Sequence, residues 1–416
     1  MNRKKILKLG LIALLAAIGF SIIACDNGST GRGGGSGNSG NSGNQGNQGN
    51  QGGNSGNQGN QGNQGDNSGN QGNQGNQDGN NSVSGGYLYA KAPPVSLSDT
   101  PVDLSDTAGA TIVDKAFTYV KANPGTYTLL LTSDIDVAEN TIRTLNQPNV
   151  NLTITGLDTE RKIRNFSTSL SYYLLTVGDS MATELTDISL TLGNNVTLLG
   201  WGVFVTGGAT FVMQDNAKIT NSRRGVSLTK GHNNLETTTF TIQDNASVSD
   251  NGTGSGIEGG AGVGVGEDCL FIMKDDASVS NNRGYAYGGG VCVDGGTFNM
   301  YGGTLSGNTV GYFGGGGVYV GTSLSRVGTF NMYGGTVSGN KATDGYGGGV
   351  YVDASCTFIM SGGTVYGSDE PSLVNTARIS GAALYSEGTA KYGDGSNILP
   401  HTDSQNRYTN NTITGR

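Results

Sequence analysis

The chain contains little of what most catalytic and metal sites are made of. Its 416 residues include only two histidines, His232 and His401, four cysteines and one tryptophan. A histidine-based triad or a zinc site needs several imidazole, thiolate or carboxylate groups acting together, and nothing in the sequence pairs these histidines. The glycine-rich segments lack the lysine of a phosphate-binding loop. We therefore expect no cofactor.

Positive charge is scarce as well. The chain has 24 Lys and Arg residues against 32 Asp and Glu residues, which gives a net charge of −8. Four of the basic residues lie within the first eight positions, so the remainder holds 20 basic against 32 acidic residues, a net charge near −12. Because an acidic surface repels phosphate backbones, we expect no nucleic-acid partner.

The N-terminus has the pattern of a secretory signal, in which basic residues precede an apolar run over positions 9–24. This run is shorter than the roughly 20 apolar residues of a membrane-spanning helix. It ends in Ser-Ile-Ile-Ala before Cys25, which resembles the lipobox of bacterial lipoproteins, where leucine more often takes the place of Ile22. The resemblance implies removal of residues 1–24 and lipidation of Cys25. An ordinary signal peptide followed by a chance cysteine is the alternative.

Lipidation would make Cys25 the attachment point to a lipid bilayer. A thiolate is the nucleophile that can accept a diacylglyceryl group, and several acyl chains together anchor a protein stably. We therefore expect an exported protein that is lipid-anchored at the outer membrane or cell surface. The sequence leaves open the choice between the inner and outer membrane.

The segment after the cysteine is built almost entirely from Gly, Asn, Gln and Ser. It has no apolar side chains to bury, so nothing would offset the entropy lost on ordering it. We expect residues 25–82 to be a disordered tether with a root-mean-square span of roughly 40 Å. An Asn/Gln-rich aggregation segment is the alternative, and the frequent glycine argues against it.

A repeat dominates the rest of the chain. The clearest copies, between residues 289 and 340, contain Gly-Val-x-Val, Thr-Phe-Asn-Met and Thr-Leu-Ser or Thr-Val-Ser, with glycine between them, and weaker copies lie upstream around Phe211, Phe240 and Phe271. The central phenylalanines are spaced 29, 31, 27, 32 and 28 residues apart, at Phe211, Phe240, Phe271, Phe298, Phe330 and Phe358. Period-two alternation indicates strands with one buried face, and glycine permits the sharp turns between them. Three strands in about 28 residues predict one coil of a right-handed parallel β-helix.

The remaining boundaries follow from this repeat. One helical face gathers apolar side chains at Ile112, Val113, Ala116, Phe117 and Val120. Asn-Pro-Gly at 123–125 ends that helix. We expect residues 83–125 to contain a helix that caps the first coil, because an open end invites edge pairing. Residues 126–388 should form about 8–10 coils, and residues 389–416 a tail or a second cap. The fold is thus predicted to be all-β apart from the capping helix.

Alternation also predicts which side chains face inward. The expected core positions are Val291, Val293, Phe298, Met300, Val318, Val320, Phe330, Met332, Val350, Val352, Phe358 and Met360. Cys292, Tyr319 and Tyr351 should then point outward. Asn308 and Asn340 end the third strand and suggest a ladder of side-chain amides. Asn221 and Asn281 are the expected upstream members of that ladder.

The repeat resembles the pectin-lyase-like β-helix superfamily. It is more closely similar to repeat-bearing bacterial surface proteins with Gly-Gly-Gly-Val and Thr-Phe-Asn-Met motifs. The resemblance covers about 200–300 residues and implies the fold. It does not decide the function, because function depends on the site that a fold carries.

Carboxylates are the first candidates for a catalytic or metal site. Asp294 and Asp353 follow equivalent strands two coils apart, which puts them about 9–10 Å from each other, near the range for inverting glycosidases. Gly321 takes that position in the coil between, and Asp-Gly is also a common turn. Three aspartates recur in equivalent turns, at Asp215, Asp244 and Asp275, and are weak candidates for binding calcium. We favour the interpretation that each is a solvated turn residue.

Aromatic residues offer the better candidate surface. They occupy turns or outward strand positions in successive coils, at Tyr285, Tyr287, Tyr312, Phe313, Tyr319, Tyr346 and Tyr351. Such a stripe can stack on sugar rings or anchor a protein partner, whereas the alternative is that the rings only cover turn glycines. We expect a non-enzymatic, adhesin-like or structural module that binds a glycan or a surface protein of a host or neighbouring cell. A polysaccharide lyase or glycoside hydrolase on the same fold is the alternative.

Overall fold

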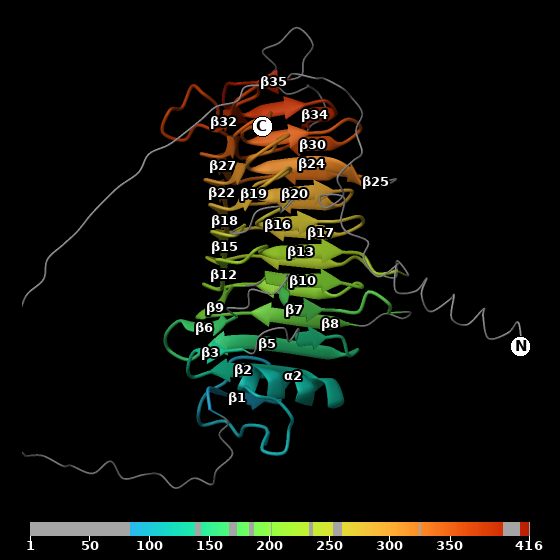
Figure 1. Cartoon of the computed structure of the whole chain (residues 1–416), viewed down its shortest axis with the longest axis vertical. Coiled ribbons are helices and arrows are strands. Elements are labelled where there is room, and N and C mark those ends of the chain that lie inside the picture. Colours follow the sequence, from blue (N-terminus) through green and yellow to red (C-terminus); the bar gives the residue numbers. More distant parts are fainter. Residues whose placement is uncertain are drawn as a thin grey trace, which may run out of the picture. The chain divides into compact units, whose positions relative to one another are not determined.

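The protein is seen in a computed structural model, which describes residues 84–137, 143–165, 173–182, 187–200, 202–232, 236–252, 260–323, 326–393 and 408–415. The predicted signal, Cys25 and the tether lie outside these residues, as does His401. The described part is nearly all β-structure with a single helix, and it forms a parallel β-solenoid of about eight turns (Figure 1). The expected all-β, parallel β-helical fold is therefore confirmed.

Each turn of the solenoid contributes one strand to each of three long sheets, which we name sheets A, B and C. Sheet A has the order β1 (Gly86–Tyr89), β2 (Thr126–Leu131), β5 (Val150–Gly156), β8 (Ile188–Leu192), β11 (Thr210–Met213), β14 (Thr239–Ile242), β17 (Leu270–Met273), β21 (Thr297–Met300), β26 (Thr329–Met332), β30 (Thr357–Met360) and β34 (Thr389–Tyr392). Sheet B has the order β3 (Ile135–Asp136), β6 (Arg161–Arg164), β9 (Val196–Leu199), β12 (Lys218–Thr220), β15 (Ser247–Ser249), β18 (Ser278–Ser280), β22 (Thr304–Ser306), β27 (Thr336–Ser338), β31 (Thr364–Val365) and β36 (Ile413–Thr414).

Sheet C closes each turn. Counted from its N-terminal end, it contains β4 (Arg143–Leu145), β7 (Tyr173–Val177), β10 (Gly202–Thr206), β13 (Val226–Thr229), β16 (Val263–Val265), β20 (Val291–Asp294), β24 (Val318–Ser323), β29 (Val350–Val352), β33 (Leu384–Ser386) and β35 (Tyr408–Thr409). The hairpin strand β25 (Arg326–Val327) pairs with β24. A short fourth sheet consists of β19 (Arg283–Gly284), β23 (Thr309–Val310), β28 (Lys341–Ala342) and β32 (Thr376–Ala377).

The core is made of columns of similar side chains, one from each turn. In sheet A the six repeat phenylalanines stack face to face, with ring centroids 4.6 to 5.1 Å apart, and all six are fully buried. Parallel, in-register pairing places each ring above the previous one. The methionines and valines predicted to face inward are also fully buried. Period-two alternation therefore identified the core correctly, because only one face of each strand can reach it.

Glycine is required at one repeated turn for two reasons. Gly303, Gly335 and Gly363 follow the sheet A strands of successive turns and have φ angles of +83°, +82° and +79°. A Cβ at these positions would lie 2.6 to 2.7 Å from the Cε methyl of a core methionine. Positive φ is unfavourable for residues with a Cβ, so both the backbone and the packing select glycine.

An asparagine ladder runs through the solenoid between sheets B and C, as predicted, but its upstream members differ from the expected ones. The buried side chains are linked Nδ2 to Oδ1 at 2.9 to 3.0 Å in the order Asn251, Asn282, Asn308, Asn340 and Asn375. The prediction of Asn221 and Asn281 is wrong: Asn282 takes the ladder position after Asn281, and Ser222, whose N–H donates to Asn251 Oδ1 at 2.9 Å, takes the one after Asn221. Asn221 and Asn281 both adopt the left-handed conformation, with φ of +52° and +56°, so they form the turn that aims the next side chain inward.

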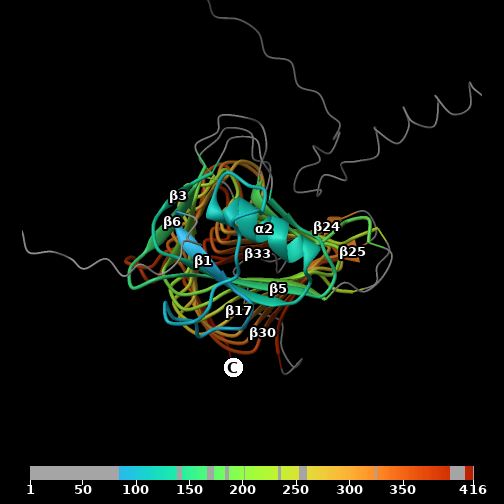
Figure 2. The same ribbon diagram turned by 90° about the horizontal axis from the view of Figure 1, so that it is seen from below.

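The N-terminal end is capped by helix α2 (Ile112–Ala122), which lies across the end of the stack (Figure 2). Its five predicted apolar residues are all buried. The helix begins with a capping box between Thr111 and Asp114, which satisfies backbone N–H groups that have no helical acceptor. Asp114 also forms a buried ion pair with Arg143 of β4, at 2.8 Å. The cap is therefore tied to the first turn by both apolar packing and charge.

The ends of the sheets are closed by strands of opposite direction. At the N-terminal end, β1 pairs antiparallel with β2. At the C-terminal end, β34 continues sheet A, while β35 and β36 pair antiparallel with β33 and β31. Unpaired parallel edges would be templates for further strand addition, so these antiparallel strands protect sheets B and C.

Candidate aromatic binding surface

The outer face of sheet C carries a ladder of tyrosine rings near its C-terminal end. In-register pairing aligns Tyr319 with Tyr351 and Tyr351 with Tyr385. Their rings stack with centroids 5.3 and 5.4 Å apart. Tyr385 was not identified from the sequence, because its strand lacks the Val-x-Val pattern of the other copies. Tyr408 of β35 extends the ladder, with its centroid 6.4 Å from that of Tyr385.

This ladder continues into the turns that precede the sheet C strands. Tyr287 stacks on Phe313 at 4.7 Å and contacts Tyr319 at 4.7 Å. Tyr346 contacts Tyr385 at 4.5 Å. We define the aromatic face as the seven predicted residues together with Tyr385. Five of the seven predicted rings thus form one contact network, to which Tyr385 connects Tyr346.

The remaining two predicted rings, Tyr285 and Tyr312, form an edge-to-face pair with centroids 4.9 Å apart. They lie in the same turns as Tyr287 and Phe313, respectively. Tyr285, Tyr312 and Phe313 are 48%, 46% and 58% exposed. These three rings form the accessible part of the aromatic face.

Other members of the aromatic face are largely covered and pack beneath the exposed rings. Tyr319 is only 8% exposed and packs on the buried side chain of Cys292, with Tyr287 and Tyr351 beside them. Cys292 thus lies outside the solenoid wall, as expected, but is covered. A Cβ at Gly314 would lie 2.6 Å from the Tyr351 ring, and one at Gly321 would collide with the Tyr319 ring. The glycine-covering interpretation therefore holds for Tyr319 and Tyr351.

A column of acidic residues borders the aromatic face where the sheet C strands end. Asp294 pairs with Gly321 of the next turn, and the N–H groups of Asp353 and Glu387 donate to Val320 and Val352 of the preceding turns, each at 2.8 Å. Successive turns therefore present Asp294, Gly321, Asp353 and Glu387. The sequence pattern predicted the two aspartates but not Glu387, because the turn that holds Glu387 differs from the Asp-Gly pattern.

Tyrosine hydroxyls bind two of these carboxylates. Tyr319 donates to Asp353 Oδ2 at 3.1 Å, and Tyr385 lies 3.3 Å from Glu387 Oε1. The N–H of Ala354 donates to Asp353 Oδ1 at 2.8 Å. Burial, reinforced by neighbouring carboxylates, raises the pKa of Tyr319 and that of Tyr351. Both phenols therefore remain protonated at neutral pH. Both oxygens of Asp353 accept hydrogen bonds.

The two candidate catalytic aspartates lie around one buried thiol. Cys356 is a free cysteine, and burial raises its pKa to about 11, with smaller contributions from Asp353 and Asp294. Cys269, also free and buried, likewise has a raised pKa. Because the thiolate is the reactive form, neither cysteine is an activated nucleophile. Asp294 is itself almost completely buried, so this arrangement does not present a pair of accessible carboxylates.

The recurring turn aspartates link one turn of the solenoid to the next. Asp215, Asp244 and Asp275 are exposed and have φ angles of +56°, +54° and +56°. The N–H of Asp215 donates to Asp244 Oδ2 at 3.0 Å, and that of Asp244 to Asp275 Oδ2 at 3.3 Å. Within the described residues, no group of three or more His, Cys, Asp or Glu side chains is arranged to hold a metal ion.

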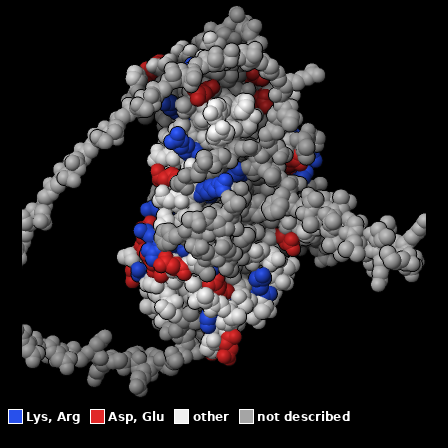
Figure 3. All heavy atoms as spheres, in the orientation of Figure 1, with Lys and Arg blue, Asp and Glu red and all other residues white. Residues whose placement is uncertain are grey.

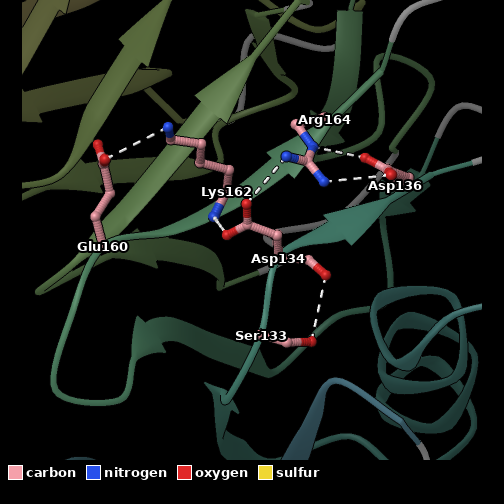
Figure 4. Close-up of polar contacts among 6 residues, drawn as sticks. All are labelled: Ser133, Asp134, Asp136, Glu160, Lys162 and Arg164. Carbon is pink, nitrogen blue, oxygen red and sulfur yellow. Dashed lines mark hydrogen bonds and ion pairs between the residues drawn. The ribbon is translucent and has the colours of Figure 1, made fainter. Parts of the chain in front are cut away.

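Charged side chains gather instead near the N-terminal end of sheet B, on the side of β3, β6 and β9 (Figure 3). Arg164 lies 2.6 Å from Asp136 and 3.0 Å from Asp134 (Figure 4). Glu160 lies 3.7 Å from Lys162 and accepts a hydrogen bond from Thr197 at 2.7 Å, and that hydrogen bond lowers its pKa. These charges satisfy one another beside the edge strand β3, where they oppose strand addition.

Among the described residues, no helix has the length and apolar character needed to cross a membrane. Comparison with known proteins supplies no relative, since no family model, no curated protein and no solved structure matches this chain.

Proposed function

We propose that this protein is an exported bacterial lipoprotein whose solenoid serves as a non-enzymatic, adhesin-like binding or structural module. Acylated Cys25 would hold it at the outer membrane or cell surface, and the glycine-rich segment would act as its tether. The charged and apolar N-terminal regions before a lipobox-like motif support export and anchoring. The resemblance of the repeat to bacterial surface proteins with a pectin-lyase-like β-helix supports a role at the cell surface.

One observation carries the binding function. Tyr285, Tyr312 and Phe313 expose about half of their surface on a rigid stack of strands. Half-exposed aromatic rings supply much contact area with few rotatable bonds, and aromatic residues dominate the energetics of many interfaces. The stacked rings beneath them hold this surface in place, which reduces the entropy lost on binding. The partner we propose is a glycan or a protein on a host or neighbouring cell.

The experiment is a binding assay with the full-length chain purified in detergent. A glycan array and intact cells would present the two classes of partner. Tyr285→Ala combined with Tyr312→Ala and Phe313→Ala should weaken binding by about tenfold or more, since each lost aromatic contact is worth about 0.5–1.5 kcal/mol beyond its buried area. Leu97→Ala removes an exposed apolar side chain from the N-terminal cap and serves as control. Unchanged binding by the triple variant would contradict the proposal.

The alternative is a polysaccharide-active enzyme that uses Asp294 and Asp353. The shared column of these carboxylates favours it, whereas the burial of Asp294 and the hydrogen bonds of Asp353 disfavour it. Release of reducing or unsaturated ends from a bound polysaccharide would identify an enzyme. If Asp294→Asn or Asp353→Asn abolished that release, the non-enzymatic proposal would be overturned.

A further inference from the structure

A second exposed aromatic pair lies at the corner between sheets A and B. Tyr301 and Tyr333 follow β21 and β26, and their rings stack with centroids 4.8 Å apart and planes within 9°. They are 52% and 44% exposed. Neither residue belongs to the aromatic face, and neither takes part in any of the core columns. The two stacked rings therefore form an exposed aromatic surface that is separate from the aromatic face.

Polar side chains continue this pair across the outer face of sheet A. Asn299 and Asn331 precede the two tyrosines by two residues, and Asn331 Nδ2 donates to Asn299 Oδ1 at 2.9 Å. Thr297 and Thr329 pair in the same register. Two adjacent turns thus present the same outward row of threonine, asparagine and tyrosine. We name these six residues the Thr-Asn-Tyr platform.

The amides of the platform retain hydrogen-bonding capacity. An asparagine side chain has two N–H donors and an oxygen with two lone pairs, and the bond between the two amides uses one donor and one acceptor. Within the described part of the chain, Asn299 Nδ2 and Asn331 Oδ1 have no other partner. A donor and an acceptor are therefore left on a half-buried, pre-ordered surface beside two aromatic rings.

The chemistry of the platform is neutral. All six side chains are uncharged, and the turn after them places Ser361 at the position of the tyrosines, with Met332 O accepting from its N–H at 2.8 Å. Lys274 holds that position one turn earlier, at the margin of the platform. Aromatic rings beside a few placed polar groups are typical of sites that bind sugars, whose rings have apolar faces and hydroxyl edges.

We propose that the Thr-Asn-Tyr platform binds a neutral, 1,4-linked polysaccharide lying along the solenoid axis. The two rings repeat at 4.8 Å, the spacing of adjacent strands, which is close to the repeat of a 1,4-linked pyranose chain. Because the two turns pair in register, neighbouring sugars would meet side chains of the same kind. This site is separate from the aromatic face, and its test does not depend on the function proposed for that face.

The test measures binding of cellohexaose, xylohexaose and mannohexaose to the full-length chain in detergent, with a galacturonic acid hexamer as the acidic comparison. At least one neutral hexasaccharide should bind. Tyr301→Ala with Tyr333→Ala should weaken that binding by about tenfold or more. Tyr301→Phe with Tyr333→Phe keeps the stacked rings and should stay within about threefold. Asn299→Ala with Asn331→Ala should weaken binding several-fold.

The outcomes separate the two sites. Tyr285→Ala with Tyr312→Ala changes only the aromatic face, so it should leave binding at the platform unchanged. The platform is overturned if no neutral hexasaccharide binds, if only the acidic hexamer binds, or if only the Tyr285 and Tyr312 variant loses binding. Because Tyr301 and Tyr333 are exposed, circular dichroism and the unfolding midpoint of their variants should match those of the natural chain. If the alanine pair at the tyrosines unfolds the protein, the asparagine pair decides the question, and unchanged binding by Asn299→Ala with Asn331→Ala overturns the platform.

Discussion

The phenol of Tyr319 and the carboxylate of Asp353 come from adjacent turns and meet in a hydrogen bond, with Tyr319 donating to Oδ2 at 3.1 Å. The phenol lies almost entirely out of solvent, between Tyr287 and Tyr351. The aromatic face is therefore anchored by a buried polar contact as well as by ring stacking. We expect this contact to make the stability of the fold depend on alkaline pH.

Stability should fall above about pH 10, the usual pKa of tyrosine. The pKa values of Tyr319 and Tyr351 are raised in the folded state, mainly by burial. A raised pKa means that its stabilising effect is fully present below the unfolded pKa and is lost as pH rises toward the folded value. Urea unfolding midpoints from pH 7 to 11.5 should show this loss, and Tyr319→Phe with Tyr351→Phe should flatten it. An equally steep fall in the variant would rule out these two phenols as the cause.

The phenylalanine column should be sensitive at its centre. Phe298 and Phe330 stack on each other at 4.7 Å and on a further ring on each side. Phe330→Ala should lower the free energy of unfolding by about 3–5 kcal/mol, because a large cavity remains in a rigid stack. Phe330→Leu retains much of the volume and should cost about 1.5 kcal/mol or less. Equilibrium urea denaturation measures both, and equal costs would argue against tight packing of this column.

The asparagine ladder allows a comparison of neighbouring residues. Asn308→Ala removes a buried amide that bonds Asn282, Asn340 and the Val279 carbonyl, and unsatisfied groups left behind should cost about 3 kcal/mol. Asn281→Gly keeps the left-handed turn and should cost no more than about 0.5 kcal/mol. Thermal or urea unfolding would reveal the difference. A larger cost at Asn281 would place the ladder one residue upstream.

The N-terminal cap depends on a buried ion pair. Asp114→Ala leaves Arg143 buried without this partner and also removes the capping box, so it should lower the free energy of unfolding by about 3–5 kcal/mol. Lys91→Ala disrupts the exposed pair with Asp99 and should leave the free energy of unfolding nearly unchanged, because water screens exposed charges. Hydrogen exchange should show the loss first in α2 and β1. Similar effects of the two substitutions would mean that burial adds nothing to the Asp114–Arg143 pair.

Anchoring is tested at Cys25. The natural chain expressed in a bacterium should appear in the membrane fraction with an acylated N-terminal cysteine, detected by metabolic labelling with a fatty acid and by mass spectrometry. Cys25→Ser should abolish labelling and release the chain from the membrane, because acyl chains supply its attachment. If Cys25→Ser stays in the membrane fraction, or if the natural chain carries no acyl group, the lipoprotein assignment is wrong.

Much of the fold followed from local pattern. Period-two alternation around Phe298, Phe330 and Phe358 predicted the strands, their inward face and their stacking, and the apolar spacing from Ile112 to Val120 predicted the cap. Similar strands repeated at a nearly constant interval can bury their apolar faces by stacking one turn on the next. The existence of the asparagine ladder was also predicted, with Asn308 and Asn340 as members. Its register was missed at Asn221 and Asn281, because the sequence alone does not specify which of two adjacent residues takes the left-handed conformation.

The candidate site was predicted less well. The sequence identified aromatic residues in successive turns, but only the tertiary structure separated the accessible rings of Tyr285, Tyr312 and Phe313 from the covered ring of Tyr319. The tertiary structure also added Tyr385 and Glu387 to the site. The turn that holds them matches the repeat sequence poorly. The outward row at Tyr301 and Tyr333 was visible in the repeat, yet a tyrosine after a core methionine gives no sign of exposure until the turn is placed.

The sequence by itself determined the periodic elements, because alternation and glycine turns are local consequences of backbone geometry. The tertiary structure decided which polar and aromatic side chains meet, because such contacts join residues about 30 positions apart and depend on strand register to a single residue. A shift of one position exchanges inward and outward faces. Contacts such as that between Tyr319 and Asp353 are therefore properties of the assembled stack, and they arise only when each turn is laid in register on the previous one.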